Sequence, residues 1–154
     1  SLNAKYCKAF DARILVYDPY KKADDPYIEQ LDDLDSVVKY SDIISLHVHV
    51  SEETTAMICK PLLKKMKADV LIINTSRGEV IDEEDTVDFL KENSNAKIAT
   101  DVLANEIRNR KESPLLNYSK ISEQVLITSH IGGMTREAQE IAYNHAVLKL
   151  KETL

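Results

Sequence analysis

The stretch VLIINTSRG, residues 70–78, decides the fold, because an apolar run ends there abruptly in polar residues. Four consecutive apolar side chains are typical of a strand buried on both faces. Residues 82–93 follow with an acidic start and then apolar side chains at helical spacing, which predicts a helix. A strand that leads into a helix is the repeating unit of a parallel α/β sheet.

The same alternation extends in both directions from this unit. It predicts strands at 13–17, 43–48, 97–102 and 125–128, with a short edge strand at 27–30, and helices at 32–40, 54–58, 61–67 and 135–150. Residues 1–10 have the spacing of the end of a helix, and the apolar positions of the last helix are expected in the core. We therefore predict an α/β fold whose parallel sheet carries helices on both faces.

Composition excludes several classes of protein. A length of 154 residues fits one domain, and a net charge of -6 argues against a nucleic-acid partner. The apolar runs are far shorter than the ~18 residues of a membrane span, so we expect no membrane association. Cys7 and Cys59 are isolated, and the N-terminus has no apolar leader, so we expect a cytoplasmic protein. None of the three glycines precedes Gly78, so the first half holds no Gly-rich phosphate loop.

The ends of the predicted strands are where a ligand should bind, because parallel sheets bind ligands at the carboxyl ends of their strands. The polar residues found there are Asp18, His47, Thr75, Ser76, Arg77, Asp101, His130, Gly132 and Gly133.

Asp18 and Arg77 each allow two interpretations. The Asp18 carboxylate could accept hydrogen bonds from ribose hydroxyls and favour NAD over NADP, or Asp18-Pro19 could simply form a turn. Arg77 could bind a carboxylate with its planar fork, or form a surface salt bridge with a neighbouring acid.

His130, Glu106 and the pair His47 and His49 are also ambiguous. His130 could act as a general acid and base or be structural, and Glu106 could orient it or be a solvated loop residue. His47 and His49 would point to one face of a strand, but no third ligand has suitable spacing, so we expect no metal site. The acidic run 82–85 is expected to stabilise the start of its helix.

Four stretches together resemble the D-isomer-specific 2-hydroxyacid dehydrogenases. They are 41–48 (SDIISLHV), 72–82 (IINTSRGEVID), 99–103 (ATDVL) and 126–133 (LITSHIGG), and the similarity runs in order from about residue 4 to 150. The resemblance implies a partial Rossmann-type, doubly wound sheet, with residues 1–154 as one partial dinucleotide-binding domain. It also implies NAD as cofactor and a 2-hydroxy or 2-oxo acid as substrate.

The resemblance also assigns roles to individual residues. Arg77 would hold the substrate carboxylate, His130 would transfer the proton on the substrate oxygen, and Glu106 would pair with His130. Asp18 would hold the adenosine ribose and Asp101 the nicotinamide carboxamide. The remaining cofactor-binding residues would be His47, Thr75, Ser76, Arg77 and the segment from His130 to Gly132 and Gly133.

Several departures from the family pattern shape the expected function. The Gly-rich loop, the strand before it and the substrate domain have no counterpart in residues 1–154. His49 and Ile107 stand where the family commonly has proline. We expect this piece to be inactive alone, and the context of His130 favours the phosphoglycerate or glyoxylate/hydroxypyruvate branch. The alternative is a non-catalytic NAD-sensing or dimerisation module of the same family.

The strand without a counterpart would lie between the strands at 13–17 and 43–48. Its absence would leave a gap of two strand spacings, about 10 Å. We expect either direct closure of those two strands or completion by another chain. Because an unpaired strand edge promotes association, we expect a homodimer.

Overall fold

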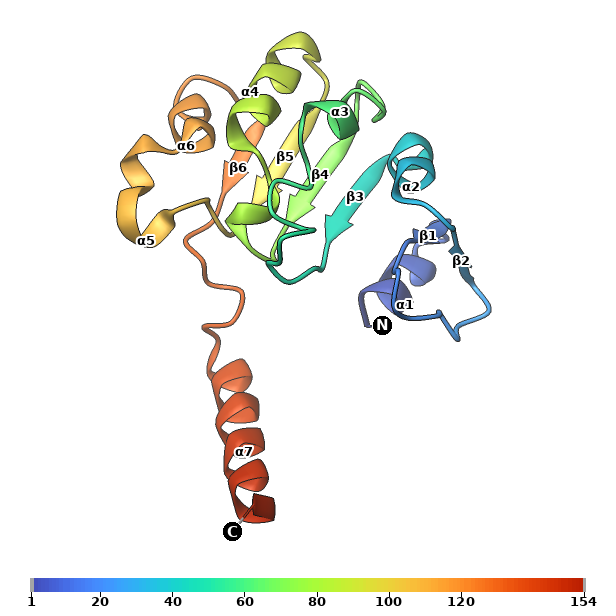
Figure 1. Ribbon diagram of the computed structural model, residues 1–154, viewed down its shortest axis with the longest axis vertical. Coiled ribbons are helices and arrows are strands. Elements are labelled where there is room, and N and C mark those ends of the chain that lie inside the picture. The colour runs from blue at the N-terminus through green and yellow to red at the C-terminus, as the bar shows by residue number, and fades with distance from the viewer. Residues whose placement is uncertain (1, 154) are drawn as a thin grey trace.

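The computed structural model describes residues 2–153 and centres on a four-stranded parallel sheet (Figure 1). Its strands lie in sequence order: β3 (Ile43–Leu46), β4 (Leu71–Asn74), β5 (Lys97–Thr100) and β6 (Val125–Ile127). Every neighbouring pair is parallel, with Ile44 opposite Ile72 and Ile72 opposite Ile98. The predicted α/β class and parallel sheet are confirmed.

Helices cover one face of this sheet (Figure 1). They are α3 (Lys60–Leu63) and α4 (Glu83–Glu92), with α6 (Pro114–Ser119) beside α4. Along the chain, the short 3-10 turn Gly78–Val80 precedes α4. Helix α5 (Glu106–Asn109) and a second 3-10 turn, Arg110–Glu112, connect β5 to α6. The buried core lies between helices and sheet and includes Leu63, Ile72, Leu90, Ile98 and Leu115.

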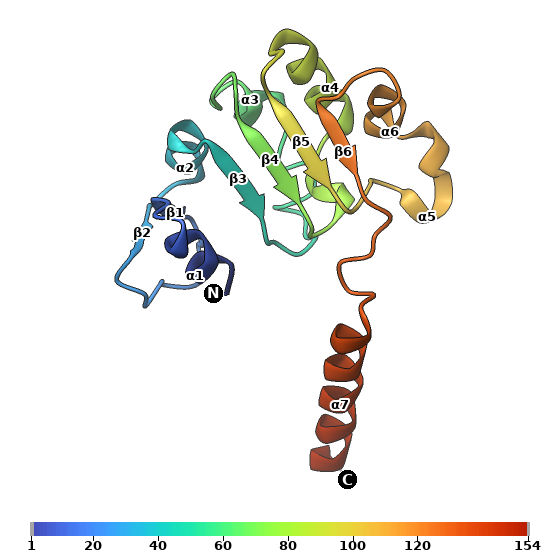
Figure 2. The same ribbon diagram turned by 180° about the vertical axis from the view of Figure 1, so that it is seen from behind.

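The opposite face of the sheet differs from the expectation of helices on both faces. Figure 2 shows strands β3–β6 with no helix in front of them. Side chains alternate accordingly, because Ile44 and Leu46 are buried whereas Ile43 on the other face is 60% exposed. Leu126 is likewise exposed, so within residues 2–153 this apolar face lacks a helical cover.

A second, two-stranded sheet lies at the N-terminal end. It pairs β1 (Ile14–Val16) with β2 (Ile28–Gln30) in parallel and follows α1 (Leu2–Ala9). Helix α2 (Leu34–Tyr40) then begins at Asp33, whose carboxylate accepts the Ser36 N–H at 2.6 Å, and leads to β3. Since β1 and β3 belong to separate sheets, the expectation of their direct closure is wrong. Completion by another chain stays a prediction.

Residues 54–56 form turns and Ile58 forms a β-bridge, in place of the predicted short helix at 54–58. The Ala56 backbone has a left-handed φ of 50°, and its N–H donates to the Glu79 carbonyl at 2.8 Å. The Ile58 N–H donates to the Val80 carbonyl at 3.0 Å, which gives a bridge between Ile58 and Ile81. These amides pair with a distant segment, so they cannot form the bonds of a helical turn.

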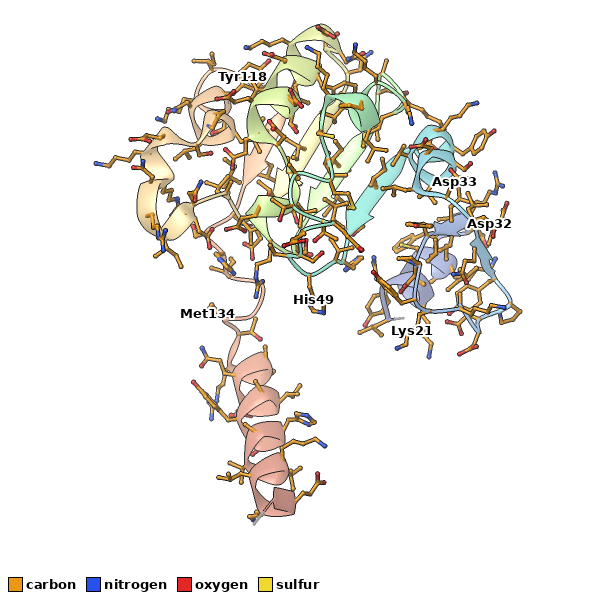
Figure 3. The ribbon with its side chains drawn as sticks, in the orientation of Figure 1. Lys21, Asp32, Asp33, His49, Tyr118 and Met134 are labelled. Atoms are coloured by element: carbon orange, nitrogen blue, oxygen red, sulfur yellow. The ribbon has the colours of Figure 1, made fainter. Side chains whose placement is uncertain are left out.

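The last helix, α7 (Arg136–Thr153), leaves the body of the molecule. Figure 3 labels Met134 in the connection that leads from the sheet to this helix. Ile141 is 71% exposed, and Tyr143, Leu148 and Leu150 are exposed as well. The expectation that its apolar positions lie in the core is therefore wrong, because an apolar stripe does not identify the surface that covers it. No helix in the described part of the chain is long and apolar enough to cross a membrane.

Candidate active site

His130 and Glu106 form a direct pair at the carboxyl edge of the sheet. His130 follows β6, and its Nδ1 is hydrogen-bonded to Oε1 of Glu106, the first residue of α5. The His130 side chain is 48% exposed and Glu106 is 25% exposed, so solvent reaches the imidazole while the carboxylate is more sheltered. The pairing leaves the other ring nitrogen, Nε2, for a proton exchange with a ligand.

Asp101 holds the loop that carries His130. Its Oδ1 accepts the Thr128 hydroxyl and the Ile131 N–H at 3.0 Å, and its Oδ2 accepts the Gly132 N–H at 2.8 Å. A Cβ on Gly132 would lie 3.1 Å from Oδ2, so the missing side chain permits this close approach. Burial raises the pKa of Asp101, but these hydrogen bonds and nearby His130 outweigh burial and hold the pKa below its ordinary value.

The Glu106 carboxylate is fixed through both oxygens. Oε1 faces His130, and Oε2 accepts the Leu103 N–H at 3.2 Å. Glu106 and His130 border an open pocket of about 210 Å³. Its lining consists of Asp101, Leu103, Glu106, Ile107, Arg110, Thr128, Ser129 and His130.

Arg77 lies in a loop after β4 that is shaped by Asn74. The buried Asn74 amide donates to the Arg77 carbonyl at 2.9 Å and accepts the Ser76 N–H at 3.0 Å and hydroxyl at 2.8 Å. Arg77 donates from Nη1 to the Ser76 carbonyl at 2.7 Å, and the side chains of Arg77 and Thr75 are exposed. The second interpretation of Arg77, a salt bridge with a neighbouring acid, is not observed among the described residues.

Gly78 joins the Arg77 loop to the segment that carries Glu106. A Cβ on Gly78 would lie 2.0 Å from the Leu103 carbonyl carbon and 2.2 Å from the Ala104 nitrogen. Only glycine permits this contact between the two backbones. Arg77, Glu106 and His130 are thus carried by segments that pack together at one edge of the sheet.

Asp18 and His47 have their side-chain hydrogen-bond partners outside this cluster. Asp18 follows β1 in the second sheet, and its Oδ1 accepts the N–H groups of Tyr20 at 2.9 Å and Lys21 at 3.0 Å. The turn interpretation of Asp18 is therefore confirmed, and its Oδ2 takes no part in that turn. His47, after β3, has Nε2 2.9 Å from Ser45 Oγ and 3.2 Å from Asn3 Nδ2 of α1.

Within residues 2–153, no group of three or more His, Cys, Asp or Glu side chains gathers into a metal site.

Three residues that organise the site are not evident from sequence spacing. Asn74 shapes the Arg77 loop, Gly78 permits the backbone contact, and Glu83 is buried beneath the segment that carries Glu106. A polar residue at the end of an apolar strand is a usable signal for Asn74. Glu83 has no such signal, because it lies in an acidic run whose other members are exposed or half-buried.

Comparison with known proteins decides the family. A family model for the NAD-binding domain of D-isomer-specific 2-hydroxyacid dehydrogenases matches residues 1–132. The chain belongs to this family. Among its relatives are a hydroxypyruvate reductase from Thermotoga maritima, 38% identical over 141 residues, and a D-3-phosphoglycerate dehydrogenase from Archaeoglobus fulgidus, 36% identical over 138 residues.

The chain covers only part of each dehydrogenase relative. Each of these alignments spans 88% of the chain, but 43% of the Thermotoga maritima protein and 25% of the Archaeoglobus fulgidus protein. A solved D-2-hydroxyisocaproate dehydrogenase matches 99% of the chain and 50% of its own length, with a TM-score of 0.85 and 28% identity. D-lactate dehydrogenase from Aquifex aeolicus, solved with NAD and lactic acid, matches 96% of the chain and 48% of its own length, with a TM-score of 0.81 and 29% identity. The Rossmann-like fold and the cofactor class, NAD, are thereby confirmed.

Proposed function

We propose that this chain is the NAD-binding part of a dehydrogenase that interconverts a D-2-hydroxy acid and a 2-oxo acid by hydride transfer. The observation that carries the proposal is the His130–Glu106 pair, which lies where parallel sheets bind ligands. The packing of Gly78 against Leu103 and Ala104 supports it, because this contact brings the Arg77 loop to the same edge.

Each residue of the cluster has a role that its chemistry permits. His130 gives a proton to the substrate oxygen during reduction and removes it during oxidation. Glu106 keeps the ring oriented by accepting a hydrogen bond from Nδ1. Arg77 binds the substrate carboxylate with two parallel hydrogen bonds. The bound cofactor would supply the hydride acceptor for oxidation as NAD and the hydride donor for reduction as NADH.

The cofactor contacts are proposed from the loops after the strands. Asp18 would accept the adenosine ribose hydroxyls through Oδ2, since the turn uses Oδ1. His47, Thr75, Ser76, Gly132 and Gly133 would line the cofactor, and Asp101 would receive the nicotinamide carboxamide while it holds the His130 loop.

The context of the reaction is also proposed. The exposure of His130 and the openness of its pocket indicate that a further substrate domain is needed to exclude water, so the 154 residues alone would be inactive. The relatives named hydroxypyruvate reductase and glyoxylate reductase favour a small 2-oxo acid as substrate. We further propose a homodimer in the cytoplasm.

Calorimetry with NADH, together with an assay of the polypeptide from the complete open reading frame, tests this function. We expect saturable NADH binding, weaker NADPH binding, and NADH oxidation with hydroxypyruvate or glyoxylate. An Asp18→Ala variant should lose at least about tenfold in NADH affinity, equivalent to about 1.4 kcal/mol. NADH binding without turnover of any 2-oxo acid would support a non-catalytic module instead, and absence of binding would reject both.

A further inference from the structure

Glu83 is a buried carboxylate that the proposed chemistry leaves unused. It is the first residue of α4 and is only 6% exposed, whereas the next residue, Glu84, is exposed. The start of the helix is already capped by Asp82, whose carboxylate accepts the Asp85 N–H at 3.0 Å. Burial of a carboxylate is costly unless its oxygens are hydrogen-bonded, so the partners of Glu83 indicate its purpose.

All the hydrogen-bond partners of the Glu83 carboxylate lie on one segment. Oε1 accepts the Ala104 N–H at 2.9 Å. Oε2 accepts the Ser113 hydroxyl at 2.5 Å and the Leu115 N–H at 3.4 Å. Glu83 thus ties together the two ends of residues 104–113, and Glu106 lies between these ends.

The start of this segment is also held from another side. Gly78 packs against the Leu103 and Ala104 backbone, and the Leu103 N–H in turn donates to Glu106 Oε2. Continuous contacts therefore lead from Glu83 through Ala104 and Leu103 to Glu106, and from Glu106 to His130.

We propose that Glu83 is a positioning residue that sets the Glu106 carboxylate against His130 by clamping residues 104–113. The inference rests on the proposed function for its catalytic consequence only. The positioning itself is a structural property of the chain.

The chemistry of the clamp calls for a carboxylate. Ala104 N–H, Ser113 O–H and Leu115 N–H are all donors, and a carboxylate is acceptor-only at both oxygens. Glutamine has the same shape, but its amide NH₂ must face a backbone N–H, either that of Ala104 or that of Leu115. Glu83→Gln therefore breaks one side of the clamp with little change in volume. Ser113→Ala removes one donor to Glu83, together with the cap that the Ser113 hydroxyl gives the Leu116 N–H of α6, and is a second variant for use if Glu83→Gln does not fold.

The first test is spectroscopic and needs no enzymatic activity. In the purified chain, ¹⁵N-labelled histidine reports the hydrogen-bonded Nδ1–H of His130, and His130→Gln identifies that signal by removing it. We expect Glu83→Gln, and to a smaller extent Ser113→Ala, to weaken or remove the same signal. Glu84→Gln should leave it unchanged.

A second control separates positioning from general loss of stability. Asp33→Ala removes the cap of α2, outside the clamp, and should lower the melting temperature without affecting the His130 signal. An unchanged His130 signal in a folded Glu83→Gln or Ser113→Ala protein would overturn the proposal. Loss of the signal in Asp33→Ala would overturn it as well, because general destabilisation would then explain the effect.

Kinetics test the catalytic consequence in the polypeptide from the complete reading frame. We expect Glu83→Gln to lower kcat on the order of 10- to 100-fold, with a much smaller change in the KM for NADH, because misplacement of a proton-transfer group slows the chemical step. If the wild type has no activity, the proposed function fails while the spectroscopic result still decides the positioning role. Wild-type kcat in the Glu83→Gln enzyme would contradict the catalytic consequence.

Discussion

At the residue scale, the His130–Glu106 pair is flanked by unusual backbone. His130 has φ of 55°, and Asn105, which precedes Glu106, has φ of 53°. Non-glycine residues in the left-handed region cost on the order of 1–3 kcal/mol each and persist only where surrounding bonds hold them. Asp101 supplies such bonds around His130 through Thr128 and Gly132. Left-handed φ also occurs at Asp11 and Ala56, so the conformations at Asn105 and His130 support the proposed site only together with the bonds that hold them.

Asp101→Asn should destabilise the chain at neutral pH by about 1–3 kcal/mol, because an amide cannot accept all the hydrogen bonds that the carboxylate accepts. The pKa of Asp101 is lowered in the folded chain, so its ionised form stabilises the fold above the unfolded pKa of ~3.9. That contribution is lost as pH falls through the lower folded pKa. Urea unfolding at pH 7 and near pH 3 should show the difference from wild type shrinking at low pH. A constant difference would contradict this assignment.

Gly78→Ala should cost about 1–3 kcal/mol or more, because the new methyl group would overlap the Leu103 and Ala104 backbone. The displaced segment carries Glu106, so the His130 signal should change too. Gly133→Ala is the matched control, since a Cβ there meets nothing within 4 Å. Denaturant unfolding of both variants measures the contrast, and equal stability of the two would disprove the packing argument.

At the element scale, the spacing of apolar residues and the polar residues that end each apolar run predicted most of the helices and strands. The strands around 70–74 and 97–100 and the helix at 83–92 formed where apolar spacing placed them. The predicted helix at 54–58 failed because the Ala56 and Ile58 amides bond to residues 79 and 80, a long-range pairing that local spacing cannot reveal. The prediction that the apolar positions of α7 lie in the core failed for a similar reason, because an amphipathic pattern carries no information on the surface that covers it.

The exposure of α7 has a measurable consequence. Ile141→Ser should change the free energy of unfolding of this chain by no more than about 0.5 kcal/mol, as for an exposed position. Leu90 lies on α4 and is fully buried, so Leu90→Ala should lower the free energy of unfolding by about 2–5 kcal/mol. Urea denaturation compares the two. A loss above 1 kcal/mol for Ile141→Ser would mean that α7 packs on the body of the protein after all.

At the scale of the whole molecule, the arrangement explains which parts of the site sequence could predict. The sequence predicted that Arg77, Asp101 and His130 share one edge of the sheet, because each follows a strand and parallel strands present their carboxyl ends together. Spacing alone gave no reason to pair Glu106 with His130, and only the family resemblance supplied it. The burial of Glu83 could not be predicted, because it depends on the packing of residues 104–115, which are far away in sequence.

The most direct test of the central claim is the rate of 2-oxo acid reduction by the His130→Ala variant. The polypeptide from the complete reading frame would be assayed with NADH and hydroxypyruvate or glyoxylate, beside NADH titration of the same samples. We predict that kcat falls on the order of 10²- to 10⁴-fold, as expected for loss of a general acid, and that NADH affinity falls by a much smaller factor. Wild-type kcat in the His130→Ala enzyme would contradict the account.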